Sequence, residues 1–338
     1  MSRDNTVLAS LNASLGAALA DERVIILGED VLSPYGGAFK VTRGLSAQFP
    51  GRVLTTPISE AGIIAVATGL ALRGLRPVVE IMFGDFLFLA GDQIVNHAAK
   101  YRAMFNEQVR MPLVIRMPSG GRRGYGPTHS QSLEKHFLGV PGLWVIAPHS
   151  LGDPGALLRQ AIFDTEDPVL FVENKIGYGE TLFADVPGYD AVTLADAASP
   201  YPSLWLKPRA PSDGFLLCYG GMARPALDAA AVLREREGLN LALLVVSQLS
   251  PTPVTHLEAV LRDATPSAVV TAEEAPAEGG WGAEMIATVE QIRDARRLAP
   301  ISYRRVGGKH IAIPSARRLE DDVLPQVDDI VAAVLDCF

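Results

Sequence analysis

The chain has 338 residues, of which 48% are hydrophobic and 20% are charged, as in globular proteins large enough for two domains. Its formal net charge of −8 argues against a surface for nucleic acid or for an anionic membrane, so neither partner is expected. Its two cysteines, Cys218 and Cys337, cannot build a metal cluster or a disulfide framework, which favours a reducing, cytoplasmic setting. No apolar run has the length of a membrane span, and residues 1–21 are typical of an amphipathic helix rather than a signal peptide.

The first half of the chain alternates short apolar runs with helical patterns, which predicts a doubly wound α/β domain with a mostly parallel sheet. The expected strands are 24–27, 52–55, 77–82, 112–117, 143–146 and 169–172, and the expected helices are 59–73, 86–104 and 153–164. Such sheets bind ligands beyond the carboxyl ends of their strands. Functional residues are therefore expected directly after the strands.

The second half begins with a turn-rich stretch and then repeats the alternation. Serine and proline residues are frequent between 174 and 213, which predicts a connection or loop. After it, strands are expected at 215–219, 241–246, 268–272 and 301–306, and helices at 224–236, 254–261 and 282–292. The sequence thus predicts one α/β domain over 1–180, a linker over 181–212 and a second α/β domain over 213–338.

One carboxylate, Glu60, stands where a strand gives way to a helix. Pro57 blocks the continuation of the strand, Ser59 can cap the helix, and an acid in the first turn suits the helix dipole. Glu60 could therefore be an ordinary surface residue. Small residues surround it, however, which leaves room for a ligand beside it: Ala61, Gly62, Ala65, Ala67 and Gly69. A carboxylate at this place could bind a ring nitrogen.

The loop 119–130 is the second candidate. Its four glycines let the backbone approach a ligand, although their order is neither a dinucleotide fingerprint nor a Walker motif. Arg122 and Arg123 could bind an anion, but such pairs are more often solvated. His129 could act as an acid or base if it lies near Glu60, and a packed core histidine is the equal alternative. Phe83, Phe86 and Phe88 could pack in the core or stack on a flat ring.

Several of these stretches resemble the β subunit of the thiamine-diphosphate-dependent E1 component of 2-oxo acid dehydrogenase complexes (pyruvate, branched-chain 2-oxo acid or acetoin), in the transketolase superfamily. The matching stretches are 28–31, 36–45, 56–62, 74–77, 80–83 with Phe86, 129–134, 141–143, 167–169 and 324–330. They follow in order over nearly the whole chain. The resemblance implies a transketolase-like pyrimidine-binding domain followed by a transketolase C-terminal domain.

The resemblance also implies roles for single residues. Glu60 would hydrogen-bond the aminopyrimidine of thiamine diphosphate, with Ile58 and Phe86 beside the ring. His129 would serve the substrate or the lipoyl group during acyl transfer. A structural K⁺ would be ringed by the backbone carbonyls of residues that leave almost no trace in the sequence: Leu113, Ala161, Asp164 and Glu166.

The cofactor's diphosphate needs a partner chain. The superfamily binds it through Mg²⁺ at a Gly-Asp-Gly motif, whereas the three Gly-Asp pairs here, at 84–85, 91–92 and 152–153, are not followed by glycine. The resemblance implies an α subunit that supplies this site in an α2β2 heterotetramer, and a lipoyl-bearing E2 that accepts the acyl group. The chain departs from the family in having Gly139 where many relatives have a second histidine, in the Arg122–Arg123 pair, and in a longer, proline-rich stretch at 201–212.

Two other functions stay open at this point. A split transketolase-like carboligase, or an acyl-transfer enzyme of a biosynthetic pathway, would share the fold and Glu60 but use another acceptor. A regulatory or assembly subunit would keep the fold without the chemistry. Intact Glu60 and His129 favour an enzyme, and the sequence does not name the 2-oxo acid.

Overall fold

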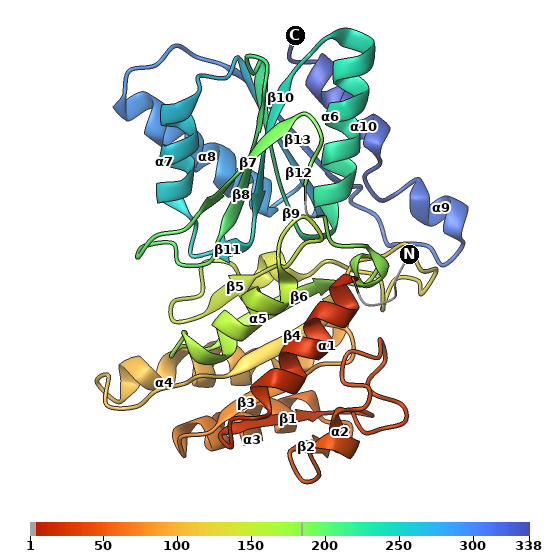
Figure 1. Ribbon diagram of the computed structural model, residues 1–338, viewed down its shortest axis with the longest axis vertical. Helices are drawn as coiled ribbons and strands as arrows, with labels where there is room; N and C mark the ends of the chain where they lie inside the picture. The colour runs from red at the N-terminus through yellow and green to blue at the C-terminus, as the bar shows by residue number, and fades with distance from the viewer. Residues whose placement is uncertain (1–4, 184) are drawn as a thin grey trace. The chain divides into compact units, whose positions relative to one another are not determined.

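The computed structural model describes residues 5–183 and 185–338. Contacts within the chain divide it into two compact units (Figure 1). The first unit comprises Met1–Ser119 and His136–Leu182, and the second comprises Gly120–Lys135 and Phe183–Phe338. The second unit therefore includes a loop whose sequence lies between two strands of the first.

The first unit is built on a parallel sheet, as predicted. Six of its strands run in the order β5-β6-β4-β3-β1-β2, and every neighbouring pair among them is parallel. Their bounds are β1 (Val24–Gly28), β2 (Val53–Thr55), β3 (Arg76–Glu80), β4 (Val114–Ser119), β5 (Trp144–Ile146) and β6 (Val169–Asn174). Strands β3 and β4 are buried along their whole length, because helices cover both faces of a doubly wound sheet.

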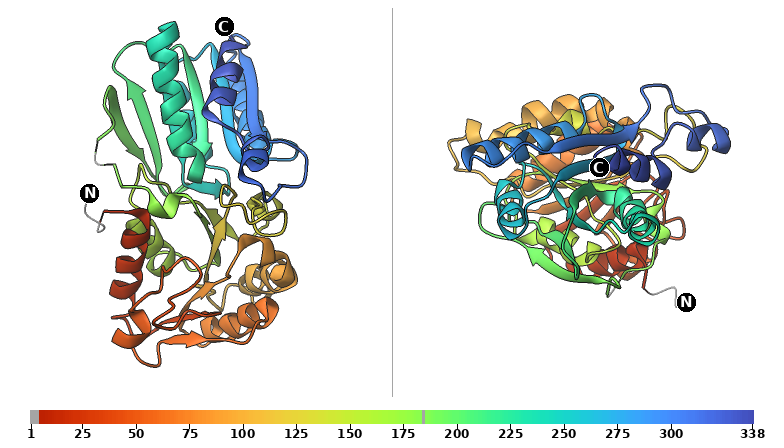
Figure 2. Two further views of the ribbon diagram at one scale, coloured as in Figure 1. Left: turned by 90° about the vertical axis from the view of Figure 1, so that its right-hand side faces the viewer. Right: turned by 90° about the horizontal axis from the view of Figure 1, so that it is seen from above.

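Helices pack on both faces of this sheet (Figure 2). On one face α1 (Val7–Ala18) packs against α5 (Pro154–Phe163), and on the other lies α3 (Glu60–Leu72). Helix α1 begins at Thr6, whose hydroxyl accepts the Ala9 N–H, and α5 begins at Asp153, whose carboxylate accepts the Ala156 N–H. The remaining short elements are α2 (Leu45–Gln48) and η4 (Gly177–Gly179), and η3 (Glu134–Phe137) spans the boundary of the two units in sequence.

The helix expected over 86–104 is not one regular α-helix. It consists of a 3₁₀ segment, η1 (Gly84–Ala90), a π-helical segment, η2 (Gln93–Ala98), and a short α-helix, α4 (Ala99–Met104). The apolar spacing of the sequence indicates a helical segment correctly. It cannot separate these forms, because their hydrogen bonds differ by only one residue in span.

The second unit has a mixed six-stranded sheet in the order β13-β12-β9-β10-β8-β7. Four of its strands are mutually parallel where they pair, and β8 and β7 add an antiparallel edge. The strands are β7 (Tyr189–Leu194), β8 (Ser203–Pro208), β9 (Gly214–Tyr219), β10 (Leu241–Val246), β12 (Ala268–Pro276) and β13 (Ser302–Gly308), and a short strand β11 (Gln248–Ser250) follows β10. The predicted fold class, two doubly wound and mostly parallel sheets, is confirmed.

Two helix pairs flank this second sheet. Helices α6 (Ala223–Glu237) and α10 (Val327–Leu335) pack together on one face, and α7 (Val254–Asp263) and α8 (Trp281–Ala295) lie on the other (Figure 1). Two shorter helical segments, η5 (Gly220–Met222) and α9 (Arg317–Asp321), complete the unit. Within the described part of the chain, no helix is both long and apolar enough to cross a membrane.

The loop predicted over 181–212 is wrong as secondary structure. Strands β7 and β8 lie inside it, and β8 pairs with β10, so that Trp205 stands 4.9 Å from Phe215, ring centroid to ring centroid. Prolines flank the two strands or end them, which produced the turn-rich pattern. Strand β7 is an edge strand with mostly exposed residues, so it carries no clear apolar alternation.

Candidate active site

Glu60 is the first residue of α3, directly after the β2–α3 connection. Its side chain is buried, with 6% exposed, and among the described residues no hydrogen bond reaches its carboxylate. Ser59 takes the N-cap position as predicted, but its hydroxyl does not cap the helix. The helix dipole is therefore the nearest favourable influence on this negative charge, which leaves the carboxylate available for a ligand.

A second buried carboxylate, Glu29, lies beside Glu60. It follows β1, which pairs with β2 so that Gly28 lies opposite Thr55, and this register brings the two strand ends together. Glu29 accepts the backbone N–H of Ser59, while its Oε1 is buried without a hydrogen-bond partner. Burial raises the pKa of Glu29, and the charge of Glu60 raises it further. Glu29 therefore keeps its proton to a higher pH than an isolated carboxyl group does.

The sequence prediction of the site did not include Glu29, although a signal was present. It is an acid immediately after a strand that neighbours β2, at the same carboxyl edge as Glu60. Two close carboxylates, one with an orphaned oxygen, fit a ligand that offers ring and exocyclic N–H groups. The aminopyrimidine expected from the sequence is such a ligand.

The two expected ring contacts differ in burial. Ile58 lies in the connection before α3, and 83% of its side chain is exposed. Phe86 is half-buried in η1, and its ring meets that of Phe83 edge to face, with 5.8 Å between the centroids. Phe83 in turn meets Phe39 at 5.6 Å. The structure thus brings Glu60, Ile58 and Phe86 into one unit, with Phe86 at the end of an aromatic row.

A buried ionic cluster ends the same row. Phe39 contacts Tyr178 at 5.5 Å, and the Tyr178 hydroxyl donates to Glu173. Arg116 lies between two carboxylates: its Nη1 is 2.8 Å from Glu80, and its Nε and Nη2 are 2.7 and 2.6 Å from Glu173. All four side chains of this cluster, Glu80, Arg116, Glu173 and Tyr178, are at least 96% buried. The sequence prediction did not find this cluster.

Burial dominates the electrostatics of this cluster. It raises the pKa of Glu80, and Arg116 opposes the rise. Burial alone would lower the pKa of Arg116, but the charges of Glu173 and Glu80 outweigh it, so its pKa is raised. Gly37, at φ +78°, lies so close that a Cβ there would be 2.3 Å from Glu80 Oε1. The loop that includes Gly37 thereby closes over the cluster.

His129 belongs to the second unit, whereas Glu60 belongs to the first. His129 is half-buried, its Nδ1 is 3.0 Å from Thr128 Oγ1, and its backbone N–H donates to Gly126. Its pairing with Glu60 stays a prediction. Arg122 is not a solvated loop residue: its guanidinium donates to the Pro325 carbonyl and the Gln326 side chain.

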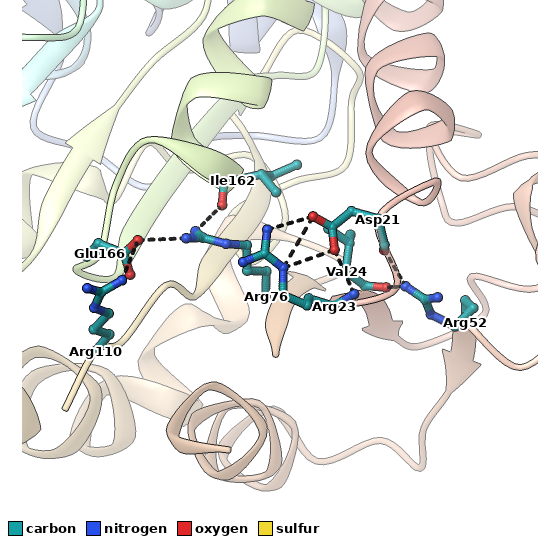
Figure 3. A network of polar contacts seen from close by, with 8 residues as sticks. All are labelled: Asp21, Arg23, Val24, Arg52, Arg76, Arg110, Ile162 and Glu166. Carbon is teal, nitrogen blue, oxygen red and sulfur yellow. Dashed lines mark hydrogen bonds and ion pairs between the residues drawn. The ribbon is translucent and has the colours of Figure 1, made fainter. Parts of the chain in front are cut away.

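Of the expected K⁺ ligands, Ala161 lies in α5, Asp164 caps the end of that helix, and Leu113 directly precedes β4. Figure 3 shows the fourth, Glu166, beside Arg76 and Arg110. Their carbonyls are partly engaged, because that of Leu113 accepts the Val169 N–H and that of Glu166 accepts the Met111 N–H. Arg76 also brings a cation here: its guanidinium is 2.6 Å from the Ile162 carbonyl and 2.6 Å from the Glu166 carboxylate. A carbonyl oxygen has two lone pairs, so a carbonyl that accepts one N–H can still bind a K⁺. The Arg76 guanidinium already supplies a positive charge beside these carbonyls.

The second unit has a buried carboxylate, Glu273, in the second half of β12. Glu273 accepts the N–H groups of Gly282 and Trp281 at 2.8 and 2.9 Å. Burial raises its pKa from 4.5 to about 7, although the two amides lower it. A raised carboxyl pKa means that the folded state holds a proton that the unfolded state releases. The free energy of unfolding therefore falls as the pH rises from the pKa of Glu273 in the unfolded chain to its pKa in the folded protein.

This pH dependence is testable with Glu273→Gln. The wild-type free energy of unfolding is expected to fall by about 3 kcal/mol more than that of the variant between pH 4.5 and pH 8, since one pKa unit corresponds to about 1.4 kcal/mol. Urea unfolding at several pH values measures it. The exposed Glu284→Gln is the control and should follow the wild type. Parallel pH profiles for wild type and Glu273→Gln would contradict the expectation.

Comparison with known proteins assigns the class. Residues 5–180 match the transketolase pyrimidine-binding domain, and residues 205–330 match the transketolase C-terminal domain. A solved structure of a split-gene transketolase, an inactive β4 tetramer, superposes with a TM-score of 0.72 at 22% identity, covering 97% of this chain and 96% of that one. At this identity the likeness shows the fold alone. The fold and the site at its first sheet define a transketolase-like protein.

More specific relatives are found among dehydrogenase subunits. The chain is 37% identical to the pyruvate dehydrogenase E1 component subunit beta-2, mitochondrial, of Oryza sativa subsp. japonica, covering 98% of this chain and 85% of that protein. It is 37% identical to the pyruvate dehydrogenase E1 component subunit beta of Leifsonia xyli (97% and 93%), and 34% identical to the 3-methyl-2-oxobutanoate dehydrogenase subunit beta of Mycobacterium tuberculosis (98% and 90%). The chain belongs to the E1 β subunits of the thiamine-diphosphate-dependent 2-oxo acid dehydrogenases.

Proposed function

We propose that this chain, together with an E1 α subunit, decarboxylates pyruvate or a branched-chain 2-oxo acid on thiamine diphosphate and passes the acyl group to a lipoyl-bearing E2. The observation that carries the proposal is the buried Glu60 at the start of α3, with Glu29 beside it. Relatives at similar identity are named for pyruvate and for 3-methyl-2-oxobutanoate, so both substrate classes enter the proposal.

The residues of the first unit would hold the aminopyrimidine end of the cofactor. Glu60 accepts a hydrogen bond from a ring nitrogen, and the raised pKa of Glu29 lets that residue keep or release a proton beside it. Ile58 and Phe86 flank the ring. When bound, thiamine diphosphate supplies the nucleophilic carbon and the electron sink for decarboxylation. The role of this chain is to orient the ring and to set its protonation.

The partner chain would hold the other end of the cofactor. We assign Mg²⁺ and the diphosphate to the α subunit, because no Gly-Asp pair of this sequence continues as Gly-Asp-Gly. The proposed assembly is an α2β2 heterotetramer, in which the pyrimidine-binding domain covers 1–180 and the C-terminal domain 213–338. A K⁺ held by the carbonyls of Leu113, Ala161, Asp164 and Glu166 belongs to the same proposal.

Reconstitution tests this function. The chain should be co-expressed with an E1 α-like subunit from the same organism. CO₂ release is measured with pyruvate and branched-chain 2-oxo acids, and acetaldehyde release is measured with acetoin, which has no carboxyl group to lose. Release that requires both chains, and acyl transfer to a lipoyl domain, would support the dehydrogenase. Transfer to an aldehyde acceptor without any to the lipoyl domain would support a carboligase instead. Activity of the chain alone would contradict the division of the cofactor site.

His129→Ala should separate two activities in the reconstituted complex. If His129 serves acyl transfer, overall activity with E2 should fall by at least about tenfold more than decarboxylation followed with an artificial electron acceptor, as for loss of one acid–base group. The exposed Pro127→Ala serves as a control for the loop. A packed histidine would instead lose both activities equally with a lower melting temperature, and equal losses without destabilisation would place His129 in decarboxylation.

A further inference from the structure

Two carboxylates of the second unit bind the backbone of the loop that carries His129. Glu274, on β12, accepts the Gly121 N–H at 2.6 Å. Glu320, in α9, accepts two N–H groups, that of Arg122 at 2.8 Å on Oε1 and that of Gly124 at 2.9 Å on Oε2. Both acids are buried, and Glu320 is fully so. Three loop amides are thus bound by two negative charges.

The loop has the backbone shape that such binding requires. Gly120, Arg122 and Gly124 all have left-handed φ values, of +90°, +68° and +69°. Left-handed residues alternating with others turn successive N–H groups to one side, which makes a concave site for an anion. For Arg122, a residue with a side chain, this conformation is unfavourable on its own. The Glu320 carboxylate fills the concave site and compensates for it.

Further contacts fix the loop on both sides of His129. The Arg122 guanidinium donates to residues 325 and 326, directly before α10, and a Cβ on Gly121 would lie 2.6 Å from Leu324 Cδ1. Beyond His129, Glu134 accepts the Tyr219 hydroxyl and Lys135 donates to the Glu278 carbonyl. The Gly120 N–H donates to the Gln131 carbonyl and closes the loop. His129 therefore lies on a segment anchored at each end.

The place of this loop in the fold is informative. Glu274 stands near the carboxyl end of β12, and doubly wound sheets bind ligands beyond the carboxyl ends of their strands. In this chain the loop 120–135 takes the place of a ligand: its backbone N–H groups donate to the carboxylates of Glu274 and Glu320. We propose that Glu320 and Glu274 are positioning residues, and that the C-terminal domain holds His129 in place through them. This inference rests on the role proposed above for His129.

A purely structural role offers an alternative that predicts differently. Buried amides need acceptors, and the two acids could satisfy them without any effect on His129. In that case Glu320→Gln would change stability but not the balance of the two activities. If Glu320 positions His129, Glu320→Gln should lower the ratio of overall activity to decarboxylation as His129→Ala does. The effects of the two substitutions on this ratio should not add.

The test uses Glu320→Gln in the assembled α–β complex, with the exposed Asp322→Asn two residues away as the matched control. Hydrogen exchange followed by mass spectrometry should show peptides over 120–126 exchanging at least tenfold faster in Glu320→Gln and unchanged in Asp322→Asn. The ratio of overall activity to decarboxylation should fall as in His129→Ala. The double variant Glu320→Gln/His129→Ala should have the ratio of His129→Ala alone.

A second variant guards against misfolding. Arg122→Ala acts from the loop side and should give the same exchange and activity pattern, with the exposed Asp322→Asn again as the control. Unchanged exchange in both Glu320→Gln and Arg122→Ala would overturn the anchoring of the loop. Faster exchange with losses that add to those of His129→Ala would overturn the action through His129. If His129→Ala itself leaves the ratio unchanged, the role proposed for His129 fails, and exchange still decides separately whether the carboxylates hold the loop.

Discussion

Glu60→Gln is expected to lower decarboxylation in the reconstituted complex by at least about 100-fold while leaving assembly intact. Glutamine keeps the shape of the side chain and loses the charge. A hydrogen bond to a charged group is worth about 1.5–3 kcal/mol, and groups that act as one catalytic unit often lose more when one is removed. Exchange of the cofactor's C2 proton, followed by NMR, reports the step that Glu60 is proposed to assist.

The control for this variant is a glutamate that also lies in the first turn of a helix but is exposed and outside the candidate active site. Glu284 occupies the first turn of α8 and is exposed, so Glu284→Gln should leave proton exchange unchanged. A second readout lies in Glu29. Because the charge of Glu60 is one cause of the raised Glu29 pKa, removing it should move that pKa downward. Wild-type proton exchange in Glu60→Gln would remove Glu60 from the mechanism.

The sequence predicted features that depend on neighbouring residues, and it did not predict features that depend on residues far apart in the chain. The place of Glu60 at the start of a helix was predictable because its evidence is local: a proline, a cap position and small neighbours within a dozen residues. Arg116 was not, since it stands in an apolar run that reads as a buried strand, and its partners come from 36 and 57 residues away. Only the register of β3, β4 and β6 brings the three charges together.

The domain boundaries show the same limit. A change in composition near residue 180 predicts where the first domain ends along the chain. It gives no sign that the loop 120–135 belongs to the second unit, because that depends on carboxylates almost 200 residues later. Strands β7 and β8 were missed for a related reason: their prolines suggest turns, and only pairing with β10 makes the segment part of a sheet.

Arg116→Met should destabilise the chain by about 3–5 kcal/mol, because it leaves Glu80 and Glu173 buried without their cation. Urea unfolding of wild type and variant measures the change. The matched control is Arg110→Met, because the Arg110 side chain is 75% exposed and its Nη1 lies 3.7 Å from Glu166 Oε1. An exposed pair of this kind is worth about 0–1 kcal/mol, so the control should unfold nearly as the wild type does.

The pH dependence of this variant distinguishes a lost charge from lost packing. Without Arg116, the influence that holds down the pKa of Glu80 is gone, so burial should raise it further. A carboxyl with a raised folded pKa loses stability as the pH rises, and the deficit of Arg116→Met should therefore be larger at pH 8 than at pH 5. Adding Glu80→Gln should restore part of the stability at pH 8 and little at pH 5. If Arg116→Met loses the same free energy of unfolding at both pH values, Arg116 stabilises the chain through packing rather than through its charge. Methionine would then differ from arginine only in filling the space less well.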